Sequence, residues 1–347
     1  MSAVPDTANS ATGVETSRIA GLHPGQWLVI ALLLIYPWIV SPFFAYQIGA
    51  YSLILGTIAL SLMMLAGYAG MVSLAQLSVA GLAGYMVAIF SANGANIGPE
   101  WPWWVVVPLA ILIGSTASAL IGAISVRTEG IYTIMITLAI AVAFFYFVRQ
   151  NYSVFNGFTG FNGIAPPVVF GINWKDPTPF YYLALFVAAA FYSMVLYARR
   201  STFGLSLQSI RDNARRASAL GYNVNAHRIA AYWFAGIIAA TAGVLSVWFN
   251  GRISPGSVGV DVAIDILVIA VVGGLSHPIG PFIGAILFVL LENFAIDLID
   301  RERFNTVIGL AFLLIVFFSP DGILGLWQRL KPKLFPGQSI DQTEPSN

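Results

Sequence analysis

A long stretch without charged side chains constrains this chain more than any other feature. No Asp, Glu, Lys or Arg occurs between Arg18 and Glu100. A helix that spans a bilayer uses about 20 apolar residues, so this stretch can supply several spans and is far too long for one core helix of a soluble protein. Of the 347 residues, 58% are hydrophobic and 9% are charged, against roughly a quarter charged in soluble domains. The sequence therefore predicts an all-α, polytopic integral membrane protein.

Apolar runs separated by polar or Gly/Pro-rich segments predict where the spans lie. We expect a bundle of about ten transmembrane helices, with eight as the lower bound. The predicted ranges are 27–45, 48–66, 71–92, 103–125, 131–149, 180–198, 229–250, 262–275, 279–298 and 304–320. The transmembrane domain then covers 27–320, between a disordered amino-terminal tail at 1–26 and a carboxy-terminal tail at 321–347.

The basic residues predict how the bundle is oriented. An even number of spans puts both termini on one side, and loops rich in Lys and Arg remain in the cytoplasm. Six arginines lie between Arg199 and Arg228, in a loop that is cytoplasmic if the amino terminus is cytoplasmic. Both tails are therefore expected in the cytoplasm.

Rare residue types exclude several classes of function. The chain has no cysteine and three scattered histidines, so we expect neither a metal cluster nor a nucleophilic catalytic site. None of its lysines follows a glycine, so the Gly-Lys pair of a phosphate-binding loop is missing. A net charge of +1 gives no indication of nucleic-acid binding. We expect a transporter rather than an enzyme, with no cofactor in this chain and any driving ATP bound by another subunit.

The polar segment 199–228 carries the strongest local pattern. Apolar residues recur there at helical spacing and form one stripe, made of Leu205, Leu207, Ile210, Ala214, Ala217 and Leu220. Gly221 ends the pattern as a C-terminal cap would. The sequence predicts a short amphipathic helix at the cytoplasmic surface, whose stripe needs a cover. That cover is either anionic lipid or a soluble partner that receives the helix in a groove.

Three blocks of the sequence resemble one family of transporters. The first block is similar to the cytoplasmic coupling loop of branched-chain amino acid ABC transporter permeases of the LivM/LivH type. The residues of this chain that match that loop are Arg211, Asp212, Asn213, Ala217, Leu220 and Gly221. The second, with Gly67 and Gly70, resembles the family's glycine-rich turn after an early span. The third begins with Ile253-Ser254-Pro255, continues from Ile264 to Gly274 with the glycine break at Gly273 and Gly274, and ends with Gly280-Pro281; it resembles the late signature of the family. Both glycine breaks are expected on the cytoplasmic side.

This chain departs from the family pattern at a few positions. Ala214 stands where an acidic residue often follows Arg-Asp-Asn, and Arg216 stands where a small residue is common. An acidic contact with an ATPase would therefore have to use Asp212. Ala75 and Gln76 stand where Gly-His is frequent, although glutamine can also form hydrogen bonds.

The resemblance implies a heteromeric importer in the inner membrane of a bacterium. Two ABC ATPase subunits would bind the coupling loops, and a second permease of similar fold would complete the pathway within the membrane lipid. A periplasmic or lipid-anchored binding protein would deliver the substrate. The implied cargo is leucine, isoleucine, valine or another small hydrophobic amino acid. Related permeases carry urea or short amides, which is one alternative. A stand-alone, ion-coupled secondary transporter is a more distant one.

Four polar residues inside predicted spans are candidates for the translocation path. A charge near the bilayer centre costs about 2.5–3.5 kcal/mol, so Asp265 and Glu292 need a purpose. Asp265 either pairs with Arg252 or lines a wet cavity. Glu292 either contacts an arginine just beyond its span or faces the path. Ser73 and Gln76 either pack helices together or line the pore near its cytoplasmic gate.

Overall fold

A computed structural model describes residues 24–298 except 96, 97, 129 and 170, and also residues 309, 310, 322, 323 and 325. The predicted tails and the predicted tenth span at 304–320 lie almost wholly outside these residues. So do Arg301 and Arg303, the arginines expected to contact Glu292. The two tails and the count of ten spans therefore remain predictions.

Helices dominate the described residues. They are α1 (Pro24–Ile39), α2 (Pro42–Phe44), η1 (Ala45–Ala50), α3 (Tyr51–Met63), η2 (Met64–Tyr68), α4 (Gln76–Phe90), α5 (Trp103–Ser125), α6 (Ile131–Gln150), α7 (Tyr152–Phe155), α8 (Pro177–Arg200), α9 (Thr202–Ala219), α10 (Val224–Asn250), η3 (Pro255–Val258), α11 (Val260–Gly273) and α12 (Gly280–Leu298). The π-helical segment η1 joins α2 to α3, and η2 extends α3, so residues Pro42–Tyr68 form one helix. Each of the first nine predicted ranges overlaps an apolar helix, most with shifted boundaries. The first range, 27–45, runs past the end of α1 into the helix that begins at Pro42.

Five of these helices are long and apolar enough to cross a bilayer. They are Pro42–Tyr68, Trp103–Ser125, Ile131–Gln150, Pro177–Arg200 and Val224–Asn250, and two shorter apolar helices lie at Gln76–Phe90 and Gly280–Phe294. The described part of the chain is therefore a polytopic helical membrane protein.

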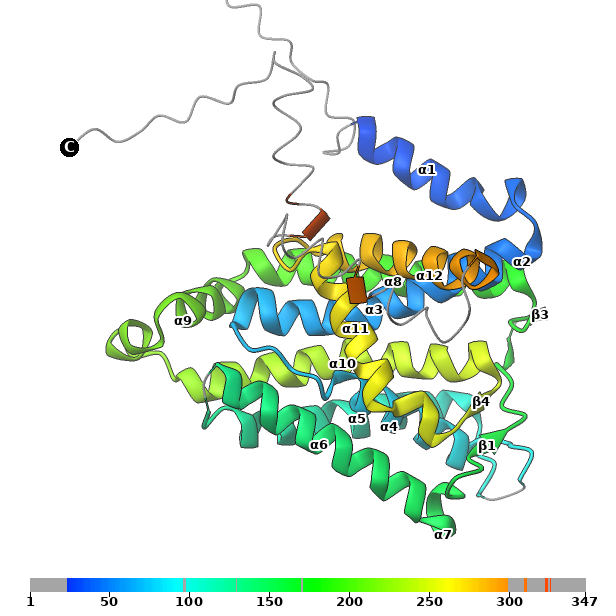
Figure 1. The fold of residues 1–347 in the computed structure, drawn as a ribbon, viewed down its shortest axis with the longest axis horizontal. Coiled ribbons are helices and arrows are strands. Elements are labelled where there is room, and N and C mark those ends of the chain that lie inside the picture. The colour runs from blue at the N-terminus through cyan, green and yellow to red at the C-terminus, as the bar shows by residue number, and fades with distance from the viewer. Residues whose placement is uncertain are drawn as a thin grey trace, which may run out of the picture.

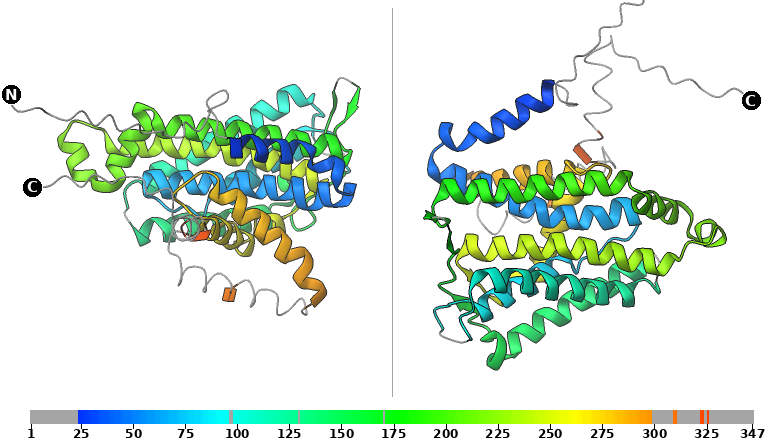
Figure 2. Two further views of the ribbon diagram at one scale, coloured as in Figure 1. Left: turned by 90° about the horizontal axis from the view of Figure 1, so that it is seen from above. Right: turned by 180° about the vertical axis from the view of Figure 1, so that it is seen from behind.

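The long helices lie side by side, and the two ends of the bundle differ (Figure 1). Helix α9 projects from one end, which we call the α9 end. Four short strands lie at the other, which we call the β4 end: β1 (Phe161–Asn162), β2 (Val168–Val169), β3 (Ile172–Asn173) and β4 (Arg252–Ile253). Figure 2 shows the same separation from above and from behind. The polar segment predicted between two spans thus lies at one end of the bundle.

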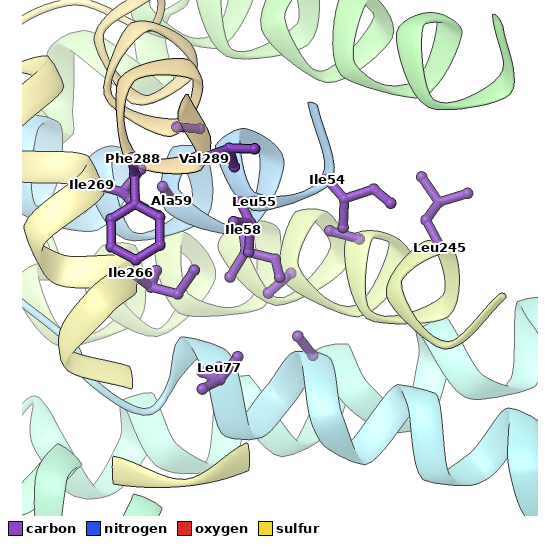
Figure 3. Packing of buried hydrophobic residues seen from close by; sticks show 14 of the residues in the cluster. Ile54, Leu55, Ile58, Ala59, Leu77, Leu245, Ile266, Ile269, Phe288 and Val289 are labelled. Carbon is purple, nitrogen blue, oxygen red and sulfur yellow. The ribbon is translucent and has the colours of Figure 1, made fainter. Parts of the chain in front are cut away.

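The helix from Pro42 to Tyr68 forms the centre of the bundle, and its most apolar part is 83% buried. Figure 3 shows its isoleucines Ile54 and Ile58 among buried side chains of α4, α10, α11 and α12. These neighbours include Leu77 of α4 and Phe288 of α12. Because lipid is as apolar as these side chains, close van der Waals packing rather than exclusion of water holds such a core together.

Small residues bring α10 close to α4 and α5. A Cβ added at Gly243 of α10 would collide with the Ala80 carbonyl of α4. A Cβ added at Gly114 of α5 would lie 2.8 Å from the Ala240 Cβ of α10. Glycine and alanine at membrane helix interfaces allow this close approach of backbones.

The predicted span 71–92 is only partly helical, because α4 begins at Gln76. Residues Met71, Ser73, Leu74 and Ala75 before it are non-helical and buried. Irregular backbone at membrane depth requires cover by protein, and here the Leu74 N–H donates to the Thr137 Oγ1 of α6 at 3.2 Å. The expectation of one continuous helix is wrong over these residues.

Helix α4 starts level with the middle of α10. Its Ala80 packs on Gly243, and its Gly84 packs on Val247. The second pair follows the first by four residues on both helices, so α4 and α10 run in the same direction. Counting four residues back from the first pair places Gln76 level with Ala239. With 15 residues, α4 is about 22 Å long, too short for the bilayer core of about 30 Å. The non-helical segment supplies the rest of the path from the α9 end.

Loops that are distant in sequence are joined at the β4 end. Strand β1 pairs antiparallel with β4, with Phe161 opposite Ile253. The Gly94 N–H, from the loop after α4, donates to the Asn162 carbonyl at 2.7 Å. Strands β2 and β3 form a separate hairpin. Three loops are thereby held together across the ends of the helices.

Candidate coupling and translocation site

Helix α9 forms where the amphipathic pattern predicted it. The Ser201 side chain caps its start by accepting a hydrogen bond from the Gly204 N–H at 3.2 Å. At its end, Gly221 has a φ of 92°. The Tyr222 N–H donates to the Ala217 carbonyl at 3.1 Å, which is the backbone bond of a glycine C-cap. The predicted glycine cap is confirmed.

Helix α9 is not continuous, which the pattern did not predict. Asn213 has φ −158° and ψ 95°, outside the helical region. Its side-chain Oδ1 accepts a hydrogen bond from the Arg216 N–H at 3.0 Å. Asparagine favours such N-cap positions over helix interiors. The sequence Arg211-Asp212-Asn213 therefore ends one short helix and begins another.

The apolar stripe of α9 is largely covered by the protein itself. Leu207, Ile210 and Ala217 are each at most 1% exposed, and Leu207 packs in a core cluster that includes Tyr68 and Tyr232. Two members of the stripe, Leu205 and Leu220, are 58% and 76% exposed. The expectation that the whole stripe awaits an outside cover is therefore wrong for its middle. The uncovered apolar surface lies at Leu205 and at the tip of the loop.

The glycine turn after the central helix packs directly on α9. Arg211 donates from its Nη1 to the Gly67 carbonyl at 2.5 Å, and its Nη2 forms an ion pair with the Asp212 Oδ1 at 2.8 Å. A Cβ added at Gly70, where φ is 69°, would lie 2.7 Å from the Arg211 Cγ. Two blocks more than 130 residues apart in sequence therefore touch through one arginine.

The second glycine break, at Gly273 and Gly274, lies at the same end of the bundle. A Cβ added at Gly67 would collide with the Leu275 carbonyl, and one added at Gly273 would collide with the Gly280 carbonyl. The turn between α11 and α12 begins at Gly274, with φ 109°. The glycine breaks of the second and third blocks thus meet the first block at the α9 end, whereas Ile253-Ser254-Pro255 of the third block lies at the β4 end.

Arg199, the penultimate residue of α8, lies beside this junction. Its guanidinium stands 5.9 Å from the centre of the Tyr68 ring. Burial, with the nearby positive charge of Arg199 as a second cause, lowers the pKa of His277 in the α11–α12 turn. The α9 end therefore holds His277 in its neutral form at neutral pH.

Ser73 and Gln76 lie deeper in the bundle. They are 0% and 1% exposed. The hydroxyl of Tyr232 on α10 lies close to that of Ser73 and to that of Ser125 on α5. Within the described part of the chain, neither Gln76 Oε1 nor Nε2 has a hydrogen-bond partner. These two candidates belong to a buried polar region beside the non-helical segment.

Asp265 of α11 and Glu292 of α12 share one neighbour on the central helix. Both carboxylates lie within electrostatic range of the Tyr51 hydroxyl of α3. Asp265 forms no ion pair with Arg252, although both are described residues. Of the two interpretations of Asp265, the structure removes the pairing with Arg252. It adds the unforeseen neighbour Tyr51.

Comparison with known proteins decides the family. Residues 44–317 match the family of permease components of branched-chain amino acid transport systems. The chain belongs to this family. The resemblance drawn from the three blocks is confirmed, and the permease family is a family of transport components rather than enzymes.

Individual relatives are distant but cover most of the permease. LivM of Salmonella typhimurium is 23% identical over 77% of this chain and 68% of the relative, and LivH of the same organism is 24% identical over 77% and 90%. The ribose import permease RbsC of Escherichia coli is 24% identical over 69% and 75%. The chain spans about two thirds of the length of the LivM relatives that it matches. No solved structure gives a significant match.

The sequence pattern did not identify several residues of the permease site. Thr137 of α6 and Tyr232 of α10 lie at the non-helical segment, and Ser125 of α5 lies beside Tyr232. Tyr51 lies within electrostatic range of the two carboxylates. Their only signal in the sequence is a hydroxyl within an apolar run. Such a signal is weak, because hydroxyl groups in membrane helices usually bond to their own helix.

Proposed function

We propose that this chain is a permease subunit of a bacterial ABC importer that carries branched-chain or other small hydrophobic amino acids across the inner membrane. Membership of the permease family and the names of its LivM and LivH relatives support this cargo. The observation that carries the mechanism is the contact of Arg211 with Gly67, because it connects α9 to the end of the central helix.

The proposed partners follow from the division of labour in such a system. Separate subunits bind ATP, and this chain needs no cofactor of its own. Two ATPases would bind the α9 ends of this permease and of a second, similar one. The exposed surface offered to an ATPase consists of Leu220 and Tyr222 with Arg215 and Arg216 beside them. A binding protein would deliver the amino acid at the β4 end.

Force would pass from α9 to the membrane interior in three steps. An ATPase moves the tip at Leu220, and α9 carries this movement to Arg211. Arg211 displaces the turn at Gly67–Gly70, to which it is bonded. The turn leads into the non-helical segment and α4, so the movement reaches the buried polar region. The result is alternating access by a rigid-body switch.

This proposal places the α9 end in the cytoplasm and the β4 end in the periplasm. The six arginines between Arg199 and Arg228 support the assignment, because basic loops remain inside. With the even number of spans expected from the sequence, both termini are cytoplasmic.

Co-purification and transport test the proposal together. The chain, extracted in mild detergent, is expected to bring with it a second permease and an ATP hydrolase. The reconstituted complex, with its binding protein, is expected to import leucine only with ATP. Uptake by this chain alone, driven by an ion gradient, would instead support the secondary transporter. Calorimetric titration of the binding protein with leucine and with urea separates the two cargo classes, and binding of urea alone would contradict the amino acid cargo.

A further inference from the structure

The amide of Gln76 is the most unusual polar group in the described bundle. Its side chain is 1% exposed, and both of its polar atoms lack a hydrogen-bond partner within the described residues. Buried polar groups are nearly always paired, because an unmade bond is costly in a low-dielectric interior. An amide that remains buried without a partner is suited to a group that arrives from outside.

The location of Gln76 strengthens this argument. It is the first residue of α4, and the N-cap residue Ala75 supplies no side-chain cap. The first N–H groups of a helix point out of its start and carry the positive end of its dipole. Side chains on a helix tilt toward the N-terminus, so the Gln76 side chain leaves the backbone in the direction of the helix start. Two kinds of hydrogen-bond donor converge there, level with the middle of α10.

Four of the surrounding segments are polar but uncharged. Ser73 precedes the helix start, and Thr137 of α6 contacts the intervening Leu74 N–H at 3.2 Å. The segments 71–90, 103–125, 131–148 and 229–250, which pack together here, contain no Asp, Glu, Lys or Arg. Helix α11, which also packs on α4, carries Asp261 and Asp265. Segments 71–90, 103–125, 131–148 and 229–250 therefore present donors and a positive dipole without a fixed charge of their own. Such a site suits one carboxylate of a zwitterion and binds it weakly enough to release it.

We propose that the start of α4 and the Gln76 amide form a transit site for the carboxylate of the amino acid cargo. The inference rests on the proposed function and names the part of the cargo that this region contacts. Helix starts within the membrane serve anionic groups of substrates in other transporters with broken helices. The site is closed in this structure, so the cargo reaches it when the bundle opens.

The decisive variant is Gln76→Met, which keeps the unbranched shape and removes the amide. The assay reconstitutes both permeases, the ATPases and the binding protein in proteoliposomes, and measures leucine imported per ATP hydrolysed. We expect this ratio to fall about tenfold or more, because a hydrogen bond to a charged group is lost. We expect the unfolding temperature to stay the same or rise, because an unpaired polar group is replaced by an apolar one.

Thr57→Val is the matched control. Thr57 is 1% exposed, like Gln76, but its hydroxyl donates to the Leu53 carbonyl of its own helix at 2.7 Å. We expect the complex with Thr57→Val to import as much leucine per ATP hydrolysed as the unmodified complex. A normal ratio in Gln76→Met, or an equal loss in both variants, would overturn the transit site. So would a lower unfolding temperature in Gln76→Met, which would make the amide a structural group.

A second variant identifies the end of the cargo that binds. Gln76→Glu places an acceptor where the amide stood, so a carboxylate site predicts a loss at least as large as in Gln76→Met. Retained import in Gln76→Glu would show that the ammonium group binds there, against the proposal. The unmodified complex tests the proposed function separately. If it imports no leucine with ATP, that function fails before any variant is compared.

Discussion

The guanidinium of Arg211 contacts both its neighbour in sequence, Asp212, and the distant carbonyl of Gly67. The ion pair with Asp212 is partly exposed, with side chains 40% and 67% accessible, and such pairs add at most about 1 kcal/mol to stability. The bond to Gly67 has the larger structural effect, because it fixes α9 against the turn that ends the central helix. The aliphatic part of the same side chain packs on Gly70.

Gly70→Ala tests this contact at the scale of single atoms. Alanine at a φ of 69° costs about 1–2 kcal/mol, and its Cβ would also lie 2.7 Å from the Arg211 Cγ. Gly130→Ala is the control, since its φ is 61° but nothing lies within 4 Å of the added Cβ. Thermal unfolding in detergent should show a greater loss of stability for Gly70→Ala. Equal losses of stability in the two variants would mean that the Arg211 side chain moves aside without cost and does not fix the turn at Gly67–Gly70.

Single residues also show what the sequence could reveal. Gly221 was predictable as a cap, because glycine alone adopts its φ of 92° without strain. The break at Asn213 had a usable signal, since asparagine within a helical pattern favours an N-cap. The contact of Arg211 with Gly67 had none, because hydropathy and spacing carry no information about which distant carbonyl an arginine reaches.

Among the elements, α4 and the non-helical segment before it were the least predictable. The residues Met71 to Ala75 are apolar or small, so they extend the hydrophobic run without a break. A buried extended segment and a buried helix give the same hydropathy. The other helices were placed correctly because polar or Gly/Pro-rich residues interrupt the apolar pattern between them.

Helix α9 allows a test of coupling at the scale of one element. Gly221→Glu adds a side chain where no atom lies within 4 Å, so the chain should still insert in the membrane. The φ of 92° disfavours any side chain, and the C-cap with the Tyr222 N–H should be lost. We expect ATP hydrolysis without leucine uptake in the reconstituted complex. Transport at the rate of the unmodified complex would count against the coupling role of α9.

At the scale of the whole molecule, two glycine breaks and the α9 block, which are far apart in sequence, meet at one end. The family and most of the helices could be predicted, because composition and short motifs carry that information. The meeting of these segments and the pairing of β1 with β4 could not, because the lengths of the spans leave open which helices touch. The resulting bundle has two chemically different ends, one with arginines and one with short strands.

Labelling of single cysteines tests which end faces the cytoplasm. The chain has no cysteine, so Leu220→Cys at the α9 end and Phe158→Cys at the β4 end provide one reactive thiol each. Both side chains are well exposed, at 76% and 67%. A membrane-impermeant maleimide should label Phe158→Cys on intact cells and Leu220→Cys only after permeabilisation. The unmodified chain shows the background, and labelling of Leu220→Cys on intact cells would refute the proposed orientation.

The pairing of Phe161 with Ile253 has a consequence for synthesis on the ribosome. Phe161 is fully buried, and its partner strand follows α8, α9 and α10 in the chain. A nascent chain that has not yet reached Ile253 cannot complete this pair, even when its first helices are already inserted. The loop before α8 therefore acquires its native shape late, after the emergence of α10 has joined the two halves of the polypeptide.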